Sequence, residues 1–161
     1  MLRRTLLLAS ALLLAACQKS GPERLAFKGI DLTGADYARA LNLTDQDGRA
    51  RSLADFKGKV VVVFFGYTQC PDVCPTTMAE VAEVKRSLGA DGDRVQGVFV
   101  TVDPERDTAS LLKAYLGSFD PSFVGLRGSE EQTRAAAKEF KVFFFFNDTA
   151  TTEIYTMDHT A

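Results

Sequence analysis

Residues 60–75 read Val-Val-Val-Val-Phe-Phe-Gly-Tyr-Thr-Gln-Cys-Pro-Asp-Val-Cys-Pro, and they carry the strongest indication of the fold. Its first six residues are an unbroken run of β-branched and aromatic side chains. Such a run predicts a strand that is buried on both faces, and we place it at the centre of a sheet. Two cysteines, Cys70 and Cys74, follow after a short loop. The stretch therefore predicts a buried strand with a thiol pair just beyond its carboxyl end.

Strand and helix patterns alternate on both sides of this strand. Alternating strands and helices predict an α/β protein with a mostly parallel central sheet flanked by helices. The class narrows to a thioredoxin-like fold for two reasons. A hairpin precedes the first long strand, and a cysteine loop follows the carboxyl end of that strand. The predicted elements are a hairpin turn at Asp47-Gly48 after residues 41–47, a helical turn at 52–58, strands at 95–102 and 123–126, and helices at 77–88, 108–116 and 129–140, the first and last with capping boxes at Thr77 and Ser129.

The two cysteines carry the candidate chemistry. A pair this close is a disulfide, a redox pair or a metal clamp, and an oxidising compartment would join Cys70 and Cys74 in a disulfide. Cysteines at i and i+4 in a loop or first helical turn place both sulfurs on one side, where a helix N-terminus stabilises thiolates. Thiolates favour Cu(I), zinc and iron–sulfur clusters, and imidazole also suits copper, so two sulfurs and one imidazole are a plausible donor set for copper. His159 is the one histidine in the chain, although a lone histidine is more often a surface or core residue than a ligand. Structural zinc normally takes four protein ligands, and only three candidates exist.

The first 17 residues have the layout of an export signal, with two arginines, an apolar stretch and then small residues. They end in Leu-Ala-Ala-Cys, which resembles the lipobox of bacterial lipoproteins, where the peptide is cut before an acylated cysteine. We therefore expect a lipoprotein signal peptide at 1–17, lipid on Cys17, a polar tether at 18–37 and the folded domain at 38–161. The protein would be exported and lipid-anchored at the bacterial cell envelope, on the periplasmic side of a membrane. A plain signal peptide or an uncleaved anchor is the alternative, although the apolar stretch is short for a membrane span.

The overall charge is mildly acidic. The chain has 19 Lys and Arg against 21 Asp and Glu, a formal net charge of −2, and removal of the signal takes away two arginines and no acids. Phosphate binding needs a clustered excess of basic residues, and the sequence contains no such cluster. Nucleic acid is therefore not an expected partner.

Four segments resemble one family, in the same order along residues 40–161. Together they are similar to the Sco/SenC family of copper chaperones, whose members carry a Cys-Pro-Asp-Val-Cys-Pro loop after a strand of a thioredoxin fold. The resemblance implies that Cys70, Cys74 and His159 bind one copper ion, for delivery to the binuclear copper centre of cytochrome c oxidase during its assembly. The implied partners are the copper-bearing subunit of that oxidase or other copper proteins. The segments are the cysteine loop at 64–77, Asp-Phe-Lys-Gly-Lys at 55–59, Val-Asp-Pro-Glu-Arg-Asp-Thr at 102–108 and Tyr-Thr-Met-Asp-His-Thr at 155–160.

Two carboxylates are expected beside the copper. Asp103 follows the second long strand, and the resemblance implies a role in copper retention or partner contact; the alternative is a carboxylate that caps the next helix. Asp158 precedes His159 and is expected to orient its ring, as carboxylates beside metal-bound histidines often do.

An enzymatic function stays open. The same thiol pair suits a thiol-disulfide oxidoreductase that reduces the copper-binding cysteines of a partner, with Cys70 or Cys74 attacking through a mixed disulfide. The spacing discriminates weakly: redox thioredoxins carry Cys-x-x-Cys, whereas three residues separate these two cysteines. A purely structural disulfide is the third alternative.

The C-terminal segment departs from the rest of the chain. Residues 143–156 read Phe-Phe-Phe-Phe-Asn-Asp-Thr-Ala-Thr-Thr-Glu-Ile-Tyr-Thr, with neither helical nor strand alternation, and four adjacent phenylalanines cannot all face one core. The segment resembles translated sequencing-adapter read-through, and we expect it to be an artefact. The alternative is a buried strand followed by a Thr-rich loop. Because the family continues through another strand and a helix, we expect a C-terminally truncated fold with an exposed sheet edge.

Overall fold

The structure of the protein is a computed structural model that describes residues 29–145 and 153–156. The chain divides into two compact units, Met1–Thr33 and Gly34–Ala161, and the helices and strands described here belong to the second. The predicted signal peptide at 1–17 and the first part of the predicted tether at 18–37 lie outside the described residues, so both stay predictions. In chain order the elements are β1 (Leu43–Asp45), β2 (Ala50–Arg51), η2 (Leu53–Phe56), β3 (Val60–Gly66), α2 (Val73–Ser87), η3 (Gly89–Arg94), β4 (Val95–Thr101), α3 (Ala109–Gly117), β5 (Val124–Arg127), α4 (Glu130–Glu139), β6 (Val142–Phe145) and β7 (Glu153–Thr156).

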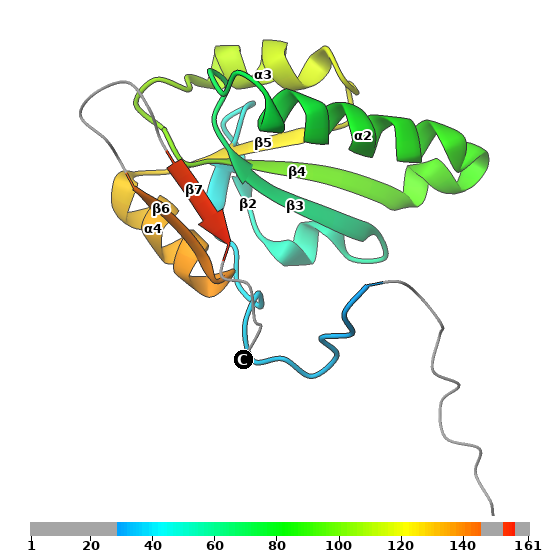
Figure 1. Cartoon of the computed structure of the whole chain (residues 1–161), viewed down its shortest axis with the longest axis horizontal. Helices are drawn as coiled ribbons and strands as arrows, with labels where there is room; N and C mark the ends of the chain where they lie inside the picture. Colours follow the sequence, from blue (N-terminus) through cyan, green and yellow to red (C-terminus); the bar gives the residue numbers. More distant parts are fainter. Residues whose placement is uncertain (1–28, 146–152, 157–161) are drawn as a thin grey trace, which may run out of the picture. The chain divides into compact units, whose positions relative to one another are not determined.

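Five strands form the central sheet in the order β2, β1, β5, β4, β3 (Figure 1). β3, β4 and β5 run parallel, whereas β1 is antiparallel to both β2 and β5. The prediction that residues 60–65 form the central strand is wrong: among the described residues β3 lies at one end of the sheet, and Val60 is 61% exposed. All seven residues of β4 are buried instead. An apolar run indicates burial but not the number of neighbouring strands, because pairing depends on segments far away in the sequence.

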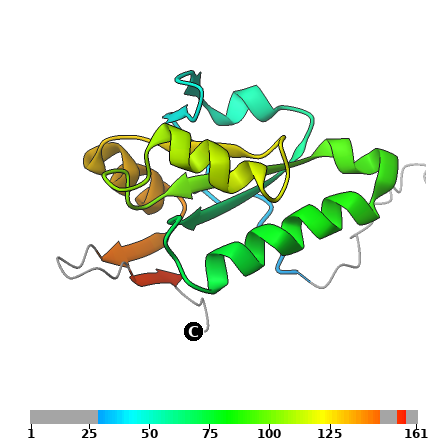
Figure 2. The same ribbon diagram turned by 90° about the horizontal axis from the view of Figure 1, so that it is seen from above.

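Helices cover both faces of the sheet, as predicted. Successive residues of a strand point to opposite faces, so Phe64 and Phe65 belong to different layers. The Phe64 ring packs against Phe99 with centroids 5.9 Å apart, and Phe99 packs against Tyr115 of α3 at 5.7 Å. Phe65 packs against Phe140, which follows α4, at 5.5 Å. α3 and α4 therefore cover opposite faces, with α2 on the same side as α3 (Figures 1 and 2).

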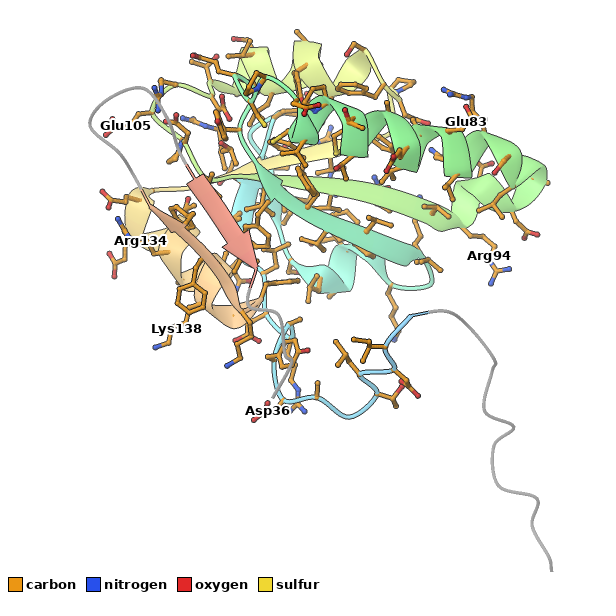
Figure 3. The ribbon with its side chains drawn as sticks, viewed as in Figure 1. Asp36, Glu83, Arg94, Glu105, Arg134 and Lys138 are labelled. Atoms are coloured by element: carbon orange, nitrogen blue, oxygen red, sulfur yellow. The ribbon has the colours of Figure 1, made fainter. Side chains whose placement is uncertain are left out.

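The outer faces of the helices carry charged side chains. Figure 3 shows Glu83 of α2, and Arg134 and Lys138 of α4, pointing away from the sheet. Glu83 pairs with Arg86, and both side chains are more than half exposed. Exposed pairs of this kind contribute about 0–1 kcal/mol, so the buried apolar faces hold the fold together.

Two of the three long helices begin where the sequence predicts. The Thr108 hydroxyl caps α3 by accepting a hydrogen bond from the amide of Leu111. Ser129 caps α4 and forms the predicted capping box with Gln132. Each cap satisfies backbone donors that an uncapped first turn would leave without a partner.

The start of α2 differs from the prediction. The helix begins at Val73, so the predicted capping box at Thr77 is wrong. The Thr76 amide already donates to the Asp72 carbonyl at 3.2 Å, because the chain turns into the helix immediately after the first cysteine.

In the part of the chain that the structure describes, no helix combines the length and the apolar character needed to cross a membrane.

The front hairpin is confirmed, and a buried aspartate closes its turn. Asp45, 2% exposed, accepts hydrogen bonds from the amides of Asp47 and Arg49, each at 2.9 Å, and from Arg51 Nε at 2.7 Å. Burial acts to raise the pKa of Asp45, but these hydrogen bonds and the Arg51 charge outweigh burial and hold the pKa below its usual value. The carboxylate therefore stabilises the hairpin in its charged form.

We expect Asp45→Asn to lower the free energy of unfolding at neutral pH by about 1.5–3 kcal/mol, the range for hydrogen bonds to a charged group. Because the folded-state pKa lies below that of an unfolded aspartate, about 3.9, the stabilisation is complete above that pH and is lost as the pH falls through the folded-state pKa. Urea unfolding of parent and variant should therefore show a difference that closes in acid. Asp47→Asn, which removes an exposed carboxylate of the same turn, is the control. A difference that persisted unchanged in acid would contradict the assignment.

Residues 142–156 contain strands that the sequence pattern did not reveal. β6 pairs antiparallel with β7 in a separate two-stranded sheet. Phe143 is 46% exposed and Phe144 is 7% exposed, so adjacent phenylalanines face opposite sides. The lack of alternation did not exclude strands: β6 agrees with the alternative of a strand at the phenylalanines, because cross-strand pairing stabilises a strand whatever its alternation. That residues 143–156 are an artefact, and that the chain is truncated, both stay predictions.

Candidate metal centre

The cysteine loop joins β3 to α2 at the carboxyl end of the parallel strands. Gly66 ends β3 and Val73 begins α2, so Cys70 lies in the loop and Cys74 in the first helical turn. The Cys74 amide donates a hydrogen bond to Cys70 Sγ at 3.4 Å, and each thiol shifts the pKa of the other. Cys70 is 9% exposed and Cys74 is 0% exposed. The two sulfurs therefore lie together, as their spacing predicts, and only Cys70 meets solvent.

The two thiols differ in their affinity for a proton. Burial acts to raise the pKa of Cys70, but hydrogen bonds from the Cys74 thiol and from the amides of Cys74, Asp72 and Val73 outweigh burial and lower that pKa. Burial, followed by the hydrogen bond donated to Cys70, raises the pKa of Cys74 to about 12. The pair therefore favours a Cys70 thiolate that accepts the Cys74 proton in a hydrogen bond.

This asymmetry predicts that Cys70 reacts with iodoacetamide before Cys74. We expect at least about a 100-fold difference in rate at neutral pH, because a thiol with a pKa near 12 has almost no thiolate and Cys74 is also inaccessible. Limited alkylation followed by peptide mass spectrometry measures the two rates. The urea-unfolded chain, in which both thiols react alike, is the control. Equal labelling of the folded protein would show that the loop does not distinguish the two sulfurs.

Both cysteines are free thiols in the structure. The disulfide predicted between Cys70 and Cys74 is therefore not formed in this state, and it stays a prediction for oxidising conditions. The hydrogen bond from the Cys74 amide to Cys70 Sγ keeps the two residues next to each other.

Asp103 lies close to the loop, as expected for a carboxylate that follows β4. Its side chain is buried and accepts a hydrogen bond from Arg106, with which it forms an ion pair. Asp103 and Arg106 both act on Tyr67, the residue after β3: burial and the two cysteine sulfurs raise the pKa of Tyr67, Arg106 lowers it and Asp103 raises it. The structure thus brings Asp103 toward the cysteine loop, and its predicted role in copper retention or partner contact stays a prediction.

Sequence reasoning missed a second buried carboxylate, Asp107. Its oxygens accept hydrogen bonds from the Thr68 amide at 3.1 Å, from the Thr68 hydroxyl at 2.5 Å and from the Thr101 hydroxyl at 2.5 Å. Its charge helps to raise the pKa of Cys74. The signal in the sequence was the second aspartate of the segment at 102–108, but nothing local showed that it would be buried against the cysteine loop.

Tyr115 of α3 was also missed. Burial raises its pKa, and the charges of both cysteines and of Asp107 add to the increase, so the ring lies near the thiol pair. Its hydroxyl is buried without a hydrogen-bond partner among the described residues. Helical spacing alone marks this residue as part of an apolar face.

The remaining predicted site residues are Cys17, Asp158 and His159, and all three lie outside the described residues. Within residues 29–145 and 153–156 no group of three Cys, His, Asp or Glu side chains could hold a metal ion. The described site is therefore a dithiol. A third protein ligand would come from residues outside these two ranges or from a partner.

The fold and this loop define a thioredoxin-like protein with a Cys-x-x-x-Cys dithiol at the carboxyl end of a parallel strand. The SCO1/SenC family model matches residues 31–161. The chain belongs to the SCO1/SenC family.

Known relatives support both the fold and the family. The mitochondrial SCO2 homolog of Mus musculus is 39% identical over 120 residues, which are 73% of this chain and 47% of that protein. The copper-bound ScoI structure of Bradyrhizobium japonicum shares 41% identity, with a TM-score of 0.64 over 72% of this chain and 75% of that one. Two further structures are also similar. A SCO1/SenC family lipoprotein from Bacillus anthracis shares 27% identity, with a TM-score of 0.64 over 75% of this chain and 77% of that one. BsSco shares 26% identity, with a TM-score of 0.54 over 64% of this chain and 62% of that one. A disulfide switch has been identified in BsSco, which is a member of the Sco family of cytochrome c oxidase assembly proteins. The chain spans about half the length of the mouse relative.

Proposed function

We propose that this protein is a copper carrier that holds one copper ion through Cys70, Cys74 and His159. It would deliver that ion to the binuclear copper centre of cytochrome c oxidase during assembly of the enzyme. The observation that carries the proposal is the pair of adjacent free thiols where the β3–α2 loop enters α2, with the pKa of Cys70 lowered in favour of the thiolate. The copper-bound ScoI relative and the oxidase-assembly role of the family to which BsSco belongs support the same assignment.

The donor set suits a soft ion. Thiolate sulfur prefers Cu(I), and imidazole adds a ligand that copper accepts equally well. Copper would bind first at the accessible Cys70 sulfur and displace the proton that Cys74 holds, so that loading releases protons. Few ligands also permit release, because the thiols of a recipient protein can replace them one at a time.

Membrane attachment is part of the proposal. A lipid on Cys17 would hold the domain at the periplasmic side of a membrane, with residues 18–37 as the tether. The Bacillus anthracis relative is itself named a lipoprotein, which supports an envelope location. Firm attachment requires more than one acyl chain. Mass spectrometry of the mature protein checks this, and an unmodified N-terminus at residue 17 would contradict it.

Delivery is tested in cells that lack the gene. We expect cytochrome c oxidase to lose copper from its binuclear centre in such cells, and the parent gene to restore it. The locus should first be resequenced across codons 143–161, so that the protein tested carries the residues that the organism encodes. An oxidase with full copper content in the deletion strain would exclude delivery.

A second candidate function is thiol-disulfide reduction of a partner's copper-binding cysteines. The asymmetry of the pair favours it: the Cys70 thiolate attacks one sulfur of the partner's disulfide, and the other partner sulfur leaves as a thiolate. Cys74, once deprotonated, then attacks Cys70 in the mixed disulfide, which releases the reduced partner and leaves a Cys70–Cys74 disulfide. A reduction potential too negative for the compartment to regenerate the dithiol would count against this reaction.

A further inference from the structure

Asp107 occupies an unusual place between the cysteine loop and the core. The residue is 1% exposed, and the donors that reach its carboxylate come from two different segments. Thr68, in the cysteine loop, donates through both its amide and its hydroxyl. Thr101, at the end of β4, donates through its hydroxyl. One buried carboxylate therefore joins the loop that carries Cys70 to the most buried strand of the sheet.

The surrounding backbone completes this connection. The Asp107 amide donates to the Asp103 carbonyl at 2.9 Å, which places the aspartate at the end of a tight turn after β4. The Val102 amide donates to the Gly66 carbonyl at 2.8 Å, so β3 and β4 stay paired up to the point where the loop leaves the sheet. Beyond this pairing, the amide and the hydroxyl of Thr68 are both held by the Asp107 side chain.

Burial explains why these hydrogen bonds matter. A buried carboxylate is tolerated only when donors replace its water, and a hydrogen bond to a charged group stabilises more than one between neutral groups. Two of the donors belong to Thr68, so a loop that moved away would leave the buried charge poorly satisfied. The Asp107 charge thus penalises every loop conformation except the one that brings Thr68 against β4.

We propose that Asp107 is the positioning residue of the dithiol loop: through Thr68 it holds the loop so that the Cys70 sulfur sits over the first turn of α2 beside Cys74. The inference rests on the proposed function for its meaning. A preordered pair of sulfurs loses less conformational entropy on binding the ion. The residue touches neither sulfur through a hydrogen bond and acts through the loop.

The test uses a matched pair of substitutions at Thr68. Thr68→Val keeps the shape and removes the hydroxyl donor, whereas Thr68→Ser keeps the donor. We expect Thr68→Val to weaken Cu(I) binding about 10-fold, the equivalent of one hydrogen bond, and Thr68→Ser to stay within about twofold of the parent. Thr68→Val should also speed hydrogen exchange at the Cys70 amide and change the ultraviolet sulfur-to-copper absorption of the loaded protein. Parent-like affinity, exchange and absorption in Thr68→Val would overturn the proposal.

Thr101→Val separates positioning from stability. It removes a donor to the same carboxylate from β4 rather than from the loop. For the same loss of unfolding free energy, we expect Thr101→Val to weaken copper binding less than Thr68→Val does. If both variants lost the same copper affinity, the role of Asp107 would be merely structural. Hydrogen exchange at the Cys70 amide needs no metal. If the parent bound no copper, the proposed function would fail, while faster exchange in Thr68→Val would still support positioning and unchanged exchange would refute it.

Discussion

Cys70→Ala is expected to weaken Cu(I) binding by more than about 100-fold. Loss of a residue that only supports a metal ligand commonly costs 10–100-fold, and Cys70 is itself a ligand in the proposed site. It is also the thiolate of the pair and the sulfur that meets solvent, so its removal takes away the first point of contact for the ion. Cys74 would be left buried and protonated, which is a poor ligand at neutral pH. Competition with a Cu(I) chelator measures the affinity, and metal analysis of the parent should find one copper per chain.

The third cysteine supplies a matched control for this experiment. Cys17→Ala removes a thiol of the same kind from the proposed lipid site, and its copper affinity should equal that of the parent. Copper bound by Cys70→Ala as tightly as by the parent would remove the basis of the carrier assignment. A loss of binding in Cys17→Ala equal to that in Cys70→Ala would point to copper held at unrelated thiols.

Phe99→Ala is expected to lower the free energy of unfolding by about 3–5 kcal/mol, the usual cost of removing a buried phenylalanine. Phe99 is fully buried in β4, and its ring contacts Phe64 of β3 and Tyr115 of α3. Truncation opens a cavity between the sheet and the helix layer that carries the site. Because a domain is typically stable by about 5–15 kcal/mol, this loss is a large fraction of the whole.

Urea unfolding measures the effect of Phe99→Ala against that of Val84→Ala. Val84 lies on α2 with 53% of its surface exposed, so its truncation should change stability by no more than about 0.5 kcal/mol. A Phe99→Ala protein within about 1 kcal/mol of the parent would show that the two layers do not meet at this ring. We expect Phe99→Ala to weaken copper binding at Cys70 only at urea concentrations where the variant begins to unfold.

Local patterns predicted most of the elements but not how they are arranged. Thr108 and Ser129 marked the starts of α3 and α4 because each side chain caps an amide three residues away, which is information contained in one short segment. The start of α2 was misplaced at Thr77, since the cysteine loop itself forms the first turn. β3 was placed at the centre of the sheet and lies at its end, because strand order is a property of long-range pairing.

In the candidate site, too, the sequence predicted some features and missed others. The spacing of Cys70 and Cys74 predicted that the two sulfurs lie together, and they do so because the loop that carries Cys70 turns directly into the helix that carries Cys74. The difference between the two thiols was not predictable, because it depends on burial and on the direction of one hydrogen bond. Asp103 was found as a strand-end carboxylate, whereas Asp107 was overlooked, although it is the residue that contacts the cysteine loop.

Short motifs and local periodicity were enough to indicate the family, the α/β class and a dithiol after a buried strand. The three-dimensional arrangement was needed to show which strand is most buried, which sulfur keeps its proton and which carboxylate holds the loop. The strand and the carboxylate depend on groups far apart in the sequence, such as Thr68 and Asp107, that meet only when β3 and β4 pair, and the protonated sulfur depends on how deeply each thiol is buried. Desolvation then acts on whatever meets there, and no local pattern encodes it.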